Sequence, residues 1–403
     1  MKIKNCRSCN SKNLTKIISL GNQYLSDFTK TNRKPKSFPL NIVLCKKCHL
    51  VQLDYTVSSK YLYTERYGYK SGINKTMHDE LREITVECLE KIKLSGKITA
   101  VDIGANDGTL LKQYPNEVLR IGVEPITKLA KECKKNANKV VNDFFTFEAF
   151  NKEVGNLKAD IVTVISCFYD MEDPNKFVSD VKKILKENGI FVIQQNYLVG
   201  MLKQNAFDNI VHEHLEYYSL LSLNNLLKRH GLEVFDVEMR DLNGGSFRTY
   251  ISLAGKRKIS NEVRKMIVSE NKLGLNKLKE YRDFANRIKK NKKDLAKFIK
   301  EETKKGKLVY LYGASTRGNT MLQYFGLDKN LIKKAVERNP EKWGKIISSV
   351  GIPIISEEQA RKDKPDYMLV LPWFFKEEFL DRERKYLEKG GHFIFPLPKF
   401  EIV

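Results

Sequence analysis

"ITAVDIGANDGTLLKQYPNEVLRIGVEP", residues 98–125, contains two apolar runs separated by a glycine turn and the start of a helix. The first run ends at Ile103, and Gly104 and Gly108 bracket a tight turn. The second run ends at Glu124, about 20 residues after the turn, where nucleotide-binding folds place an acid for ribose hydroxyls. The stretch therefore predicts a βαβ unit of an α/β fold that binds a nucleotide-like ligand.

The turn itself favours a methyl donor over a dinucleotide. Its pattern is D-x-G-x-x-x-G from Asp102, in place of the G-x-G-x-x-G of dinucleotide folds. Asp107 lies inside the turn, where its charge would repel a pyrophosphate but attract the ammonium group of S-adenosylmethionine (SAM). The segment resembles motif I of the class I SAM-dependent methyltransferases. The residues expected to hold SAM are Asp102, Gly104, Asn106, Asp107, Gly108 and Glu124.

The central region continues the same alternation of strands and helices. "VVNDFF" (140–145) fits the next strand end, where we expect Asp143 to bond the adenine amine and Phe144 to pack on the ring. Residues 159–198 then contain a strand, a loop, a helix, a glycine turn and another strand. We therefore predict a Rossmann-like SAM-binding domain over residues 66–255.

Four of the seven cysteines form two CxxC pairs near the start of the chain: Cys6, Cys9, Cys45 and Cys48. Each pair can hold one metal ion with two thiolates, and two pairs complete a tetrahedral zinc shell. Four thiolates leave no open coordination position, so the pattern predicts a structural zinc ion. We expect this zinc domain to span residues 1–65.

A polar segment, "FDNIVHEHLEYYS" (207–219), follows the predicted fifth strand. Ligands of open α/β sheets bind above the carboxyl ends of the strands, which is where this segment should lie. In an extended segment His212 and His214 would point one way and Glu213 the other. A histidine can accept a proton near neutral pH, so the segment is a candidate source of a general base.

Taken together, these motifs resemble a known family, the deoxysugar C-methyltransferases of antibiotic and surface-polysaccharide pathways. The likeness covers the whole chain and continues through "NGGSFR" (243–248), "GASTRGNTMLQYFG" (313–326) and "GGHFIFPLP" (390–398). It implies a zinc domain, a central SAM domain and a C-terminal Rossmann-like domain. The implied reaction methylates a carbon next to the keto group of a nucleotide-linked 4-keto-6-deoxysugar. His214 matches the family's base, and Glu213 matches its glutamate.

Two positions depart from the family pattern. Val211 stands where the family has a tyrosine, and Asp170 takes the place of a family histidine in the loop after the fourth strand. Tyr169 and Tyr217 are the candidates for the missing hydroxyl. The exact sugar and the carbon methylated are therefore left open.

The remaining residues, 256–403, are predicted to form a long linking helix and the C-terminal Rossmann-like domain. The helix is expected over 260–305 and carries the lysine cluster of 287–307, whose one aromatic residue, Phe298, is too few for a stacking surface and favours a solvated linker over a nucleic-acid arm. "YGASTRGN" (312–319) starts a second βα unit with a degenerate glycine loop, so no second cofactor is expected. The candidates for substrate contacts are Tyr217, Asn243, Arg248 and, for a phosphate, Arg317.

The composition sets limits on the other functions. The formal charge is +23, from 72 basic against 49 acidic residues, which is typical of proteins that bind nucleic acid. The basic residues are, however, spread along the chain. The alternatives are an O- or N-methyltransferase acting on another small molecule and, less favoured, an RNA methyltransferase. The first residues have no apolar core of a signal peptide, and no run is long enough to span a bilayer. We therefore expect a cytoplasmic enzyme without membrane insertion.

Overall fold

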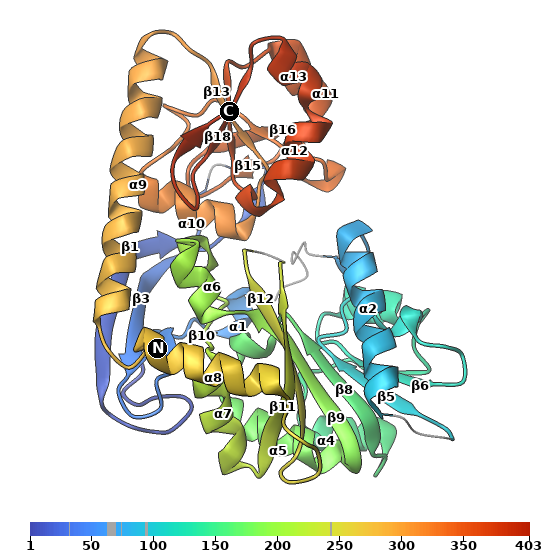
Figure 1. The fold of residues 1–403 in the computed structure, drawn as a ribbon. Coiled ribbons are helices and arrows are strands. Elements are labelled where there is room, and N and C mark those ends of the chain that lie inside the picture. Colours follow the sequence, from blue (N-terminus) through green and yellow to red (C-terminus); the bar gives the residue numbers. More distant parts are fainter. Residues whose placement is uncertain (32, 63–69, 74, 93–95, 242–243) are drawn as a thin grey trace.

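The computed structural model describes residues 1–403 other than 32, 63–69, 74, 93–95 and 242–243. Three sheets organise the described part of the chain, in sequence order a four-stranded, a seven-stranded and an eight-stranded one (Figure 1). The strands of the first and third sheets include short pieces from elsewhere in the sequence, so the three units are built into one another.

The central sheet has the order β11-β12-β9-β8-β5-β6-β7. Its strands from β7 to β9 are parallel, and β12 runs antiparallel to both β9 and β11. The strand bounds are β5 (Thr99–Ile103), β6 (Leu119–Val123), β7 (Lys139–Val141), β8 (Ala159–Ile165), β9 (Leu185–Asn196), β11 (Leu232–Arg240) and β12 (Ser246–Leu253). All five residues of β5 are buried, including the polar Thr99 and Asp102, because a parallel strand covered on both faces has no exposed side.

Helices cover both faces of this sheet, which confirms the predicted α/β architecture (Figure 1). On one face, Leu81, Ile84 and Cys88 of α2 pack in a cluster with Ile161 and Val192 of the strands. The helices of the central region are α2 (Lys75–Ile92), α3 (Thr127–Cys133), α4 (Phe147–Val154), α5 (Pro174–Ile184), α6 (Leu198–Lys203) and α7 (Leu220–Arg229).

The N-terminal sheet has the order β1-β3-β4-β10. Its bounds are β1 (Leu14–Tyr24), β3 (Ser37–Cys45), β4 (Val51–Leu53) and β10 (Glu216–Tyr217), and the short helix α1 (Ser59–Leu62) follows β4. The last strand comes from the segment after the fifth central strand and pairs antiparallel with β4, Glu216 opposite Gln52 and Tyr217 opposite Val51. The cysteine-bearing unit is thereby joined to the polar segment 207–219.

The C-terminal sheet has the order β19-β18-β17-β13-β14-β16-β15-β2. Its five central strands are parallel, and β2 comes from the N-terminal region to pair with β15. The strand bounds are β2 (Phe28–Thr29), β13 (Val309–Tyr312), β14 (Ala335–Val336), β15 (Ile346–Ile347), β16 (Ile352–Ile355), β17 (Tyr367–Val370), β18 (His392–Phe395) and β19 (Glu401–Ile402). The helices are α10 (Thr316–Phe325), α11 (Glu357–Asp363), α12 (Lys376–Arg382) and α13 (Arg384–Glu388).

The predicted helical run over 260–305 is two helices, α8 (Asn261–Leu273) and α9 (Lys279–Lys304). Gly274 ends α8 in the left-handed conformation, with φ 66°, which a continuous helix cannot accommodate. The helix α9 runs along the side of the molecule toward the C-terminal sheet (Figure 1). Its buried face includes Phe284, Ile288 and Leu295. Within the described residues, no helix combines the length and apolar character needed to cross a bilayer.

A buried charge network fastens α2 to the sheet. Arg248 of β12 is fully buried, and its guanidinium contacts Glu80 at 2.7 Å, Gln194 at 2.7 Å and Glu87. Arg240 of β11 adds a second ion pair to Glu80, at 2.9 Å. A guanidinium taken out of water is stable only while its partners remain, so Arg248 is a structural link between helix and sheet.

Replacing Arg248 by methionine should destabilise the protein by about 3 kcal/mol or more, because two glutamates lose their buried partner. The measurement is the midpoint of urea unfolding followed by circular dichroism. Arg384→Met is the control: its ion pair with Asp381 has side chains 70% and 78% exposed, and such pairs contribute less than about 1 kcal/mol. Equal effects of the two substitutions would contradict the structural role of Arg248.

Candidate active site

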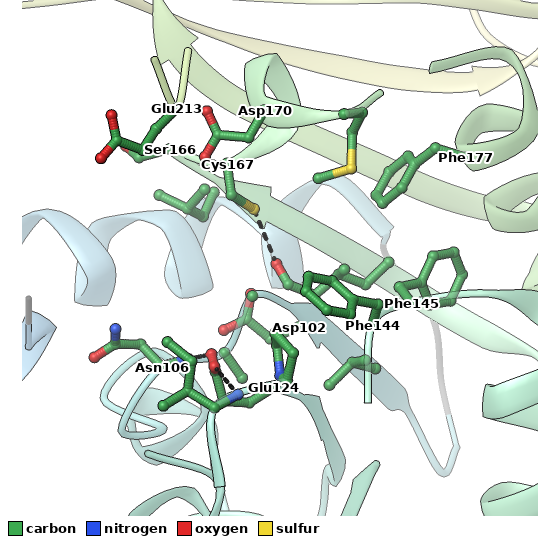
Figure 2. Close-up of a pocket in the computed structure, with 18 of the residues that line it drawn as sticks. Asp102, Asn106, Glu124, Phe144, Phe145, Ser166, Cys167, Asp170, Phe177 and Glu213 are labelled. Atoms are coloured by element: carbon green, nitrogen blue, oxygen red, sulfur yellow. Dashed lines mark hydrogen bonds between the residues drawn. The ribbon is translucent and has the colours of Figure 1, made fainter. Parts of the chain in front are cut away.

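A cavity of about 380 Å³ opens at the carboxyl ends of the central parallel strands. Figure 2 shows Asp102, Asn106 and Glu124 on one side of it and Asp170 and Glu213 on the opposite side. Aromatic residues close a third side. The cavity thus has two polar walls that face each other across a space large enough for small ligands.

Two buried carboxyl groups form the first wall. Asp102 is the next-to-last residue of β5, and its Oδ1 accepts a hydrogen bond of 2.6 Å from the Thr163 hydroxyl. Burial raises the pKa of Asp102 to about 7. The Glu124 carboxylate accepts backbone N–H bonds from Asn106 at 2.9 Å and Ile126 at 2.8 Å, while burial raises its pKa. This wall can accept hydrogen bonds from ligand hydroxyl or ammonium groups.

The glycine turn brings backbone close to its neighbours. Gly104 has φ 75°, and a Cβ there would lie 2.8 Å from the Sγ of Cys167. Gly108 has φ 79°, and a Cβ there would lie 3.1 Å from the Cα of Cys133. Any side chain at either position would force the turn away from the strands and helix behind it.

Three of the residues predicted to hold SAM do not line the cavity: Asp107, Gly108 and Asp143. The Asp107 carboxylate accepts hydrogen bonds from the Thr109 hydroxyl at 2.6 Å and the Gly72 N–H at 3.0 Å, so it holds the turn together. Asp143 is exposed and accepts the N–H of Phe144 at 2.7 Å. Phe144 itself lines the cavity with half of its surface exposed.

The second wall comes from two loops. Asp170 ends the 3₁₀ helix η3 (Phe168–Asp170) after β8, and Glu213 lies in a turn after the 3₁₀ helix η4 (Phe207–Asn209). Both line the cavity, and burial raises the pKa of Glu213. Glu213 is therefore the acid of the polar segment that faces the cavity directly.

His214 lines a second, much smaller cavity of about 10 Å³, together with Tyr169, Glu216 and Tyr217. Its Nδ1 lies 2.8 Å from the carbonyl oxygen of Asn209, so Nδ1 carries the proton and Nε2 keeps its lone pair. Burial lowers the pKa of His214 to about 3. The imidazole is neutral and held in one tautomer, as a general base requires.

The hydroxyl candidates surround this imidazole. The ring of Tyr169 lies edge-on to His214 with centroids 4.4 Å apart. The Tyr217 side chain is buried, and its hydroxyl lies beside the backbone of Val211. The structure therefore brings both candidate tyrosines next to the predicted base.

The expectation that His212 and His214 point the same way is wrong, because the segment turns at residues 212 and 213. His212 is directed to the N-terminal unit, where its Nε2 lies 3.2 Å from the Phe38 carbonyl oxygen. Burial lowers the pKa of His212 to about 4. The two histidines thus have different neighbours.

The other predicted substrate residues lie elsewhere. Arg248 lies inside the charge network under α2. It is not placed to contact a ligand in the cleft, because its N–H groups donate to Glu80, Glu87 and Gln194. Arg317 is ion-paired with Asp208 at 2.7 Å, and its contact with a phosphate stays a prediction. Asn243 lies outside the described residues.

Sequence reasoning missed several groups at the site. The cavity wall includes Ser71, Met77 and Leu81 from the region before the first central strand, and Ser166 and Glu172 from the loop after β8. The carbonyl of Asn209, which orients His214, is a backbone group. None of these stands in a recognisable motif, so only the folded geometry reveals them.

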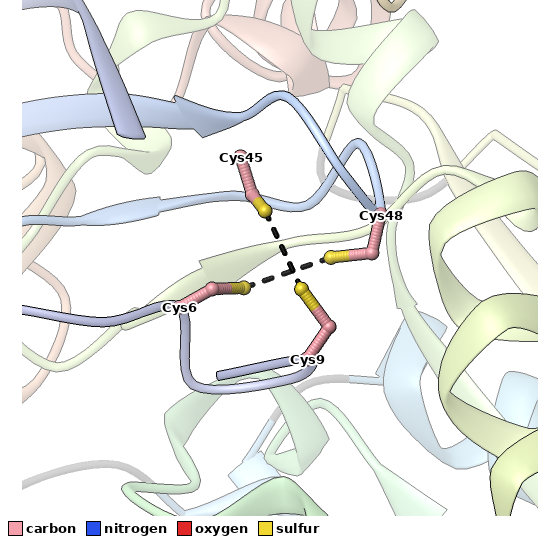
Figure 3. A group of neighbouring side chains, drawn as sticks. All are labelled: Cys6, Cys9, Cys45 and Cys48. Atoms are coloured by element: carbon pink, nitrogen blue, oxygen red, sulfur yellow. Dashed lines mark hydrogen bonds between the residues drawn. The ribbon is translucent and has the colours of Figure 1, made fainter. Parts of the chain in front are cut away.

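The two cysteine pairs meet at one point (Figure 3). The sulfurs of Cys6, Cys9, Cys45 and Cys48 all lie within 4.8 Å of one another. The Gln52 amide donates to the Cys6 sulfur at 3.1 Å. Four convergent thiolates with a hydrogen-bonding neighbour suit a tetrahedral zinc ion and leave no position for a reactant.

Comparisons with known proteins cover the whole chain. Family models match for a zinc binding domain over residues 6–63, a methyltransferase domain over 73–237 and a C-methyltransferase C-terminal domain over 241–398. The chain is similar to the C-methyltransferase NovU of Streptomyces niveus, with 31% identity over 409 residues, which covers 100% of this chain and 97% of that protein.

Two solved structures are similar to less than half of the chain. A SAM-dependent methyltransferase from Clostridium acetobutylicum has 13% identity and a TM-score of 0.36, over 45% of this chain and 92% of its own. The CcbJ methyltransferase from Streptomyces caelestis has 12% identity and a TM-score of 0.36, over 47% of this chain and 100% of its own. Similarities of this size carry no argument about function.

The purified protein should contain one zinc ion per chain, measured by inductively coupled plasma mass spectrometry. Cys45→Ser should lose the metal and lower the thermal unfolding midpoint, because zinc binding contributes to folding. Cys88→Ala, which removes a buried thiol outside the cluster, should keep one zinc ion. A full complement of zinc in Cys45→Ser would contradict the four-cysteine site.

Proposed function

The chain belongs to the C-methyltransferase family and is a SAM-dependent methyltransferase with a zinc-binding domain, and from this premise we propose that it methylates a nucleotide-linked keto-deoxysugar. In this proposal the methyl group is added to the carbon next to the keto group. The reaction belongs to deoxysugar or polysaccharide biosynthesis and takes place in the cytoplasm. The observation that carries the proposal is one cavity with opposed polar walls, adjoined by a neutral histidine of fixed tautomer.

For the cofactor, the first wall fits SAM. Bound SAM supplies an electrophilic methyl group. The Glu124 carboxylate, which is already fixed by two backbone N–H groups, has lone pairs left for ribose hydroxyls. Asp102 adds an acceptor on the same side, Asn106 lines the wall with its Oδ1 bonded to the N–H groups of Ser71 and Asp107, and Phe144 offers an aromatic face. Asp107 and Gly108 contribute by shaping the turn, and Asp143 lies beside Phe144.

For the substrate, the second wall fits a carbon acid. Removing a proton beside a carbonyl leaves an enolate, whose carbon would bond to the methyl group of SAM while S-adenosylhomocysteine leaves. We assign His214 as the base, because its Nε2 lone pair is unprotonated at neutral pH. Tyr169 and Tyr217 are the candidate donors to the enolate oxygen. Asp170 and Glu213 then orient the sugar from the wall of the cavity.

Glu213 is the rival candidate for the base, because it lines the larger cavity and His214 lines the smaller one. Burial raises the pKa of Glu213 and lowers that of His214. The two assignments therefore predict different responses to acid, which an experiment can separate.

Exchange of the substrate's α-hydrogen in D2O should keep its rate from about pH 8 to about pH 5 if His214 is the base, since its lone pair stays available well below neutral pH. With Glu213 as the base, the rate should fall as the pH drops through the raised pKa, because protonation removes the carboxylate. The measurement is proton NMR of an NDP-4-keto-6-deoxysugar incubated with the enzyme.

His214→Asn should slow both exchange and methyl transfer by roughly 10²–10⁴-fold, the contribution of an acid–base group, while SAM binding stays intact. His212→Asn is the matched control, since that ring contacts the N-terminal unit, and its exchange rate should resemble that of the wild type. Normal exchange in His214→Asn, with exchange lost in His212→Asn or Glu213→Gln, would move the base to the other residue.

Glu124→Gln should weaken SAM binding by about 1.5–3 kcal/mol, because a charge-assisted hydrogen bond to the ribose is lost. Isothermal titration calorimetry with SAM or S-adenosylhomocysteine gives the affinity. Glu187→Gln serves as the comparison, since that side chain is 69% exposed and pairs with Lys256 away from the cavity lining. An affinity for Glu124→Gln equal to that of the wild type would place the ribose elsewhere.

The substrate class is tested directly by incubating the enzyme with SAM and a panel of NDP-4-keto-6-deoxysugars. Mass spectrometry should find one product in which a methyl group replaces a hydrogen atom. The added methyl group should be bonded to carbon. Methylation of a hydroxyl or amino group in place of carbon would favour the alternative, an O- or N-methyltransferase.

A further inference from the structure

The C-terminal domain reaches the segment that carries His214 through one buried carboxylate. Asp208 of η4 is fully buried, and its Oδ2 accepts Arg317 at 2.9 Å through Nε and lies 2.7 Å from Nη2. The indole N–H of Trp373 donates to the same oxygen at 3.2 Å. Both donors belong to the C-terminal domain, at the start of α10 and after β17. A carboxylate of the central domain is therefore held by two donors of another domain.

Packing around this contact restricts both partners. The Arg317 guanidinium lies over the ring of Phe374, 4.7 Å from its centroid. The side chain of Phe207, next to Asp208, packs against Tyr324 and Phe325 of α10 with ring centroids 5.2 and 5.3 Å apart. The η4 turn is thus fixed by an ion pair on one side and by aromatic contacts on the other.

The next residue along η4 connects this contact to the imidazole. The Asn209 carbonyl oxygen lies 2.8 Å from His214 Nδ1. The Asn209 side chain accepts a hydrogen bond of 3.0 Å from Asn196 at the end of β9. A carbonyl that must point at one ring nitrogen depends on the orientation of the peptide that carries it. Asp208 precedes that peptide directly.

We infer that Arg317 is a positioning residue for the methyl-transfer reaction: by holding Asp208, it fixes the Asn209 carbonyl and thereby the tautomer of His214. The C-terminal domain then contributes to the chemistry without a residue of its own at the reacting atoms. Consistent with this, the positive charge of Arg317 adds to burial in lowering the pKa of His214.

Lysine cannot replace arginine in this role, because its ammonium group lacks the planar fork that presents Nε and Nη2 to one carboxylate. Arg317→Lys keeps the charge and removes the fork, and Arg317→Met removes both. Arg382→Met is the matched control: Arg382 is a similarly enclosed arginine of the same domain, with a side chain 24% exposed, paired with Glu378 at 3.2 Å.

The test reads the tautomer of His214 in the full-length protein with S-adenosylhomocysteine, by 15N NMR of histidine-labelled protein. Only six histidines are present, and His214→Asn assigns the signal. In the wild type and in Arg382→Met we expect a protonated Nδ1 and a bare Nε2. In Arg317→Lys and Arg317→Met we expect averaged shifts that indicate a mixture of tautomers.

The kcat of methyl transfer should fall in Arg317→Lys by roughly tenfold or more, which is a part of the 10²–10⁴-fold contribution of a base. The affinity for S-adenosylhomocysteine should stay unchanged. If Arg317→Met does not fold, Arg317→Lys decides on the same criteria. Wild-type tautomer signals in the folded Arg317 variants, or equal changes in Arg382→Met, would overturn the inference.

The inference rests on the proposed role of His214, and the two can fail separately. Methylation by His214→Asn at the wild-type rate would remove the proposed base, whatever the tautomer signals show. A loss of activity in His214→Asn, combined with an unchanged tautomer in both Arg317 variants, would leave the base in place and remove the positioning role.

Discussion

The antiparallel pairing of β4 with β10 is the contact on which the site depends. On one side of it, Gln52 hydrogen-bonds the Cys6 sulfur of the metal cluster. On the other, the backbone N–H of Leu53 donates to the carbonyl of Leu215 at 2.9 Å, next to His214. The backbone hydrogen bonds between β4 and the segment of β10 therefore connect the metal cluster to the candidate base. A shift of one of the two segments would strain these hydrogen bonds and displace the other segment.

Burial governs the chemistry of the cavity more than net charge does. The chain carries a formal charge of +23, yet acids, among them Asp102, Glu124, Asp170 and Glu213, line the cavity. Burial raises the pKa of the first two and of Glu213. A cationic ligand placed among them would favour their ionised forms and lower those pKa values again. Ligand binding and ionisation of the walls are thus coupled, which suits a cofactor that carries positive charge.

Local patterns in the sequence were sufficient to predict the fold class and the cysteine cluster. The glycine turn at Gly104 and the cysteine pairs could be recognised because their geometry depends on residues close together in sequence. Contacts between distant segments could not: nothing in the sequence indicates that Asp208 binds Arg317 or that Arg248 lies under α2. The hydrogen bonds by which Asp107 holds its own turn could not be predicted from the sequence either. The turn at His212, which separates the two histidines, likewise depends on the pairing of β10.

The exchange of strands between units has a consequence for the order of synthesis. The four cysteines of the metal cluster lie within the first 48 residues, so these thiolates leave the ribosome early. The partner of β4, however, is β10 at Glu216–Tyr217, and the partner of β2 is β15 at Ile346–Ile347. During translation the nascent N-terminal unit therefore exposes two unpaired strand edges, and the second one is covered only after most of the chain has been made.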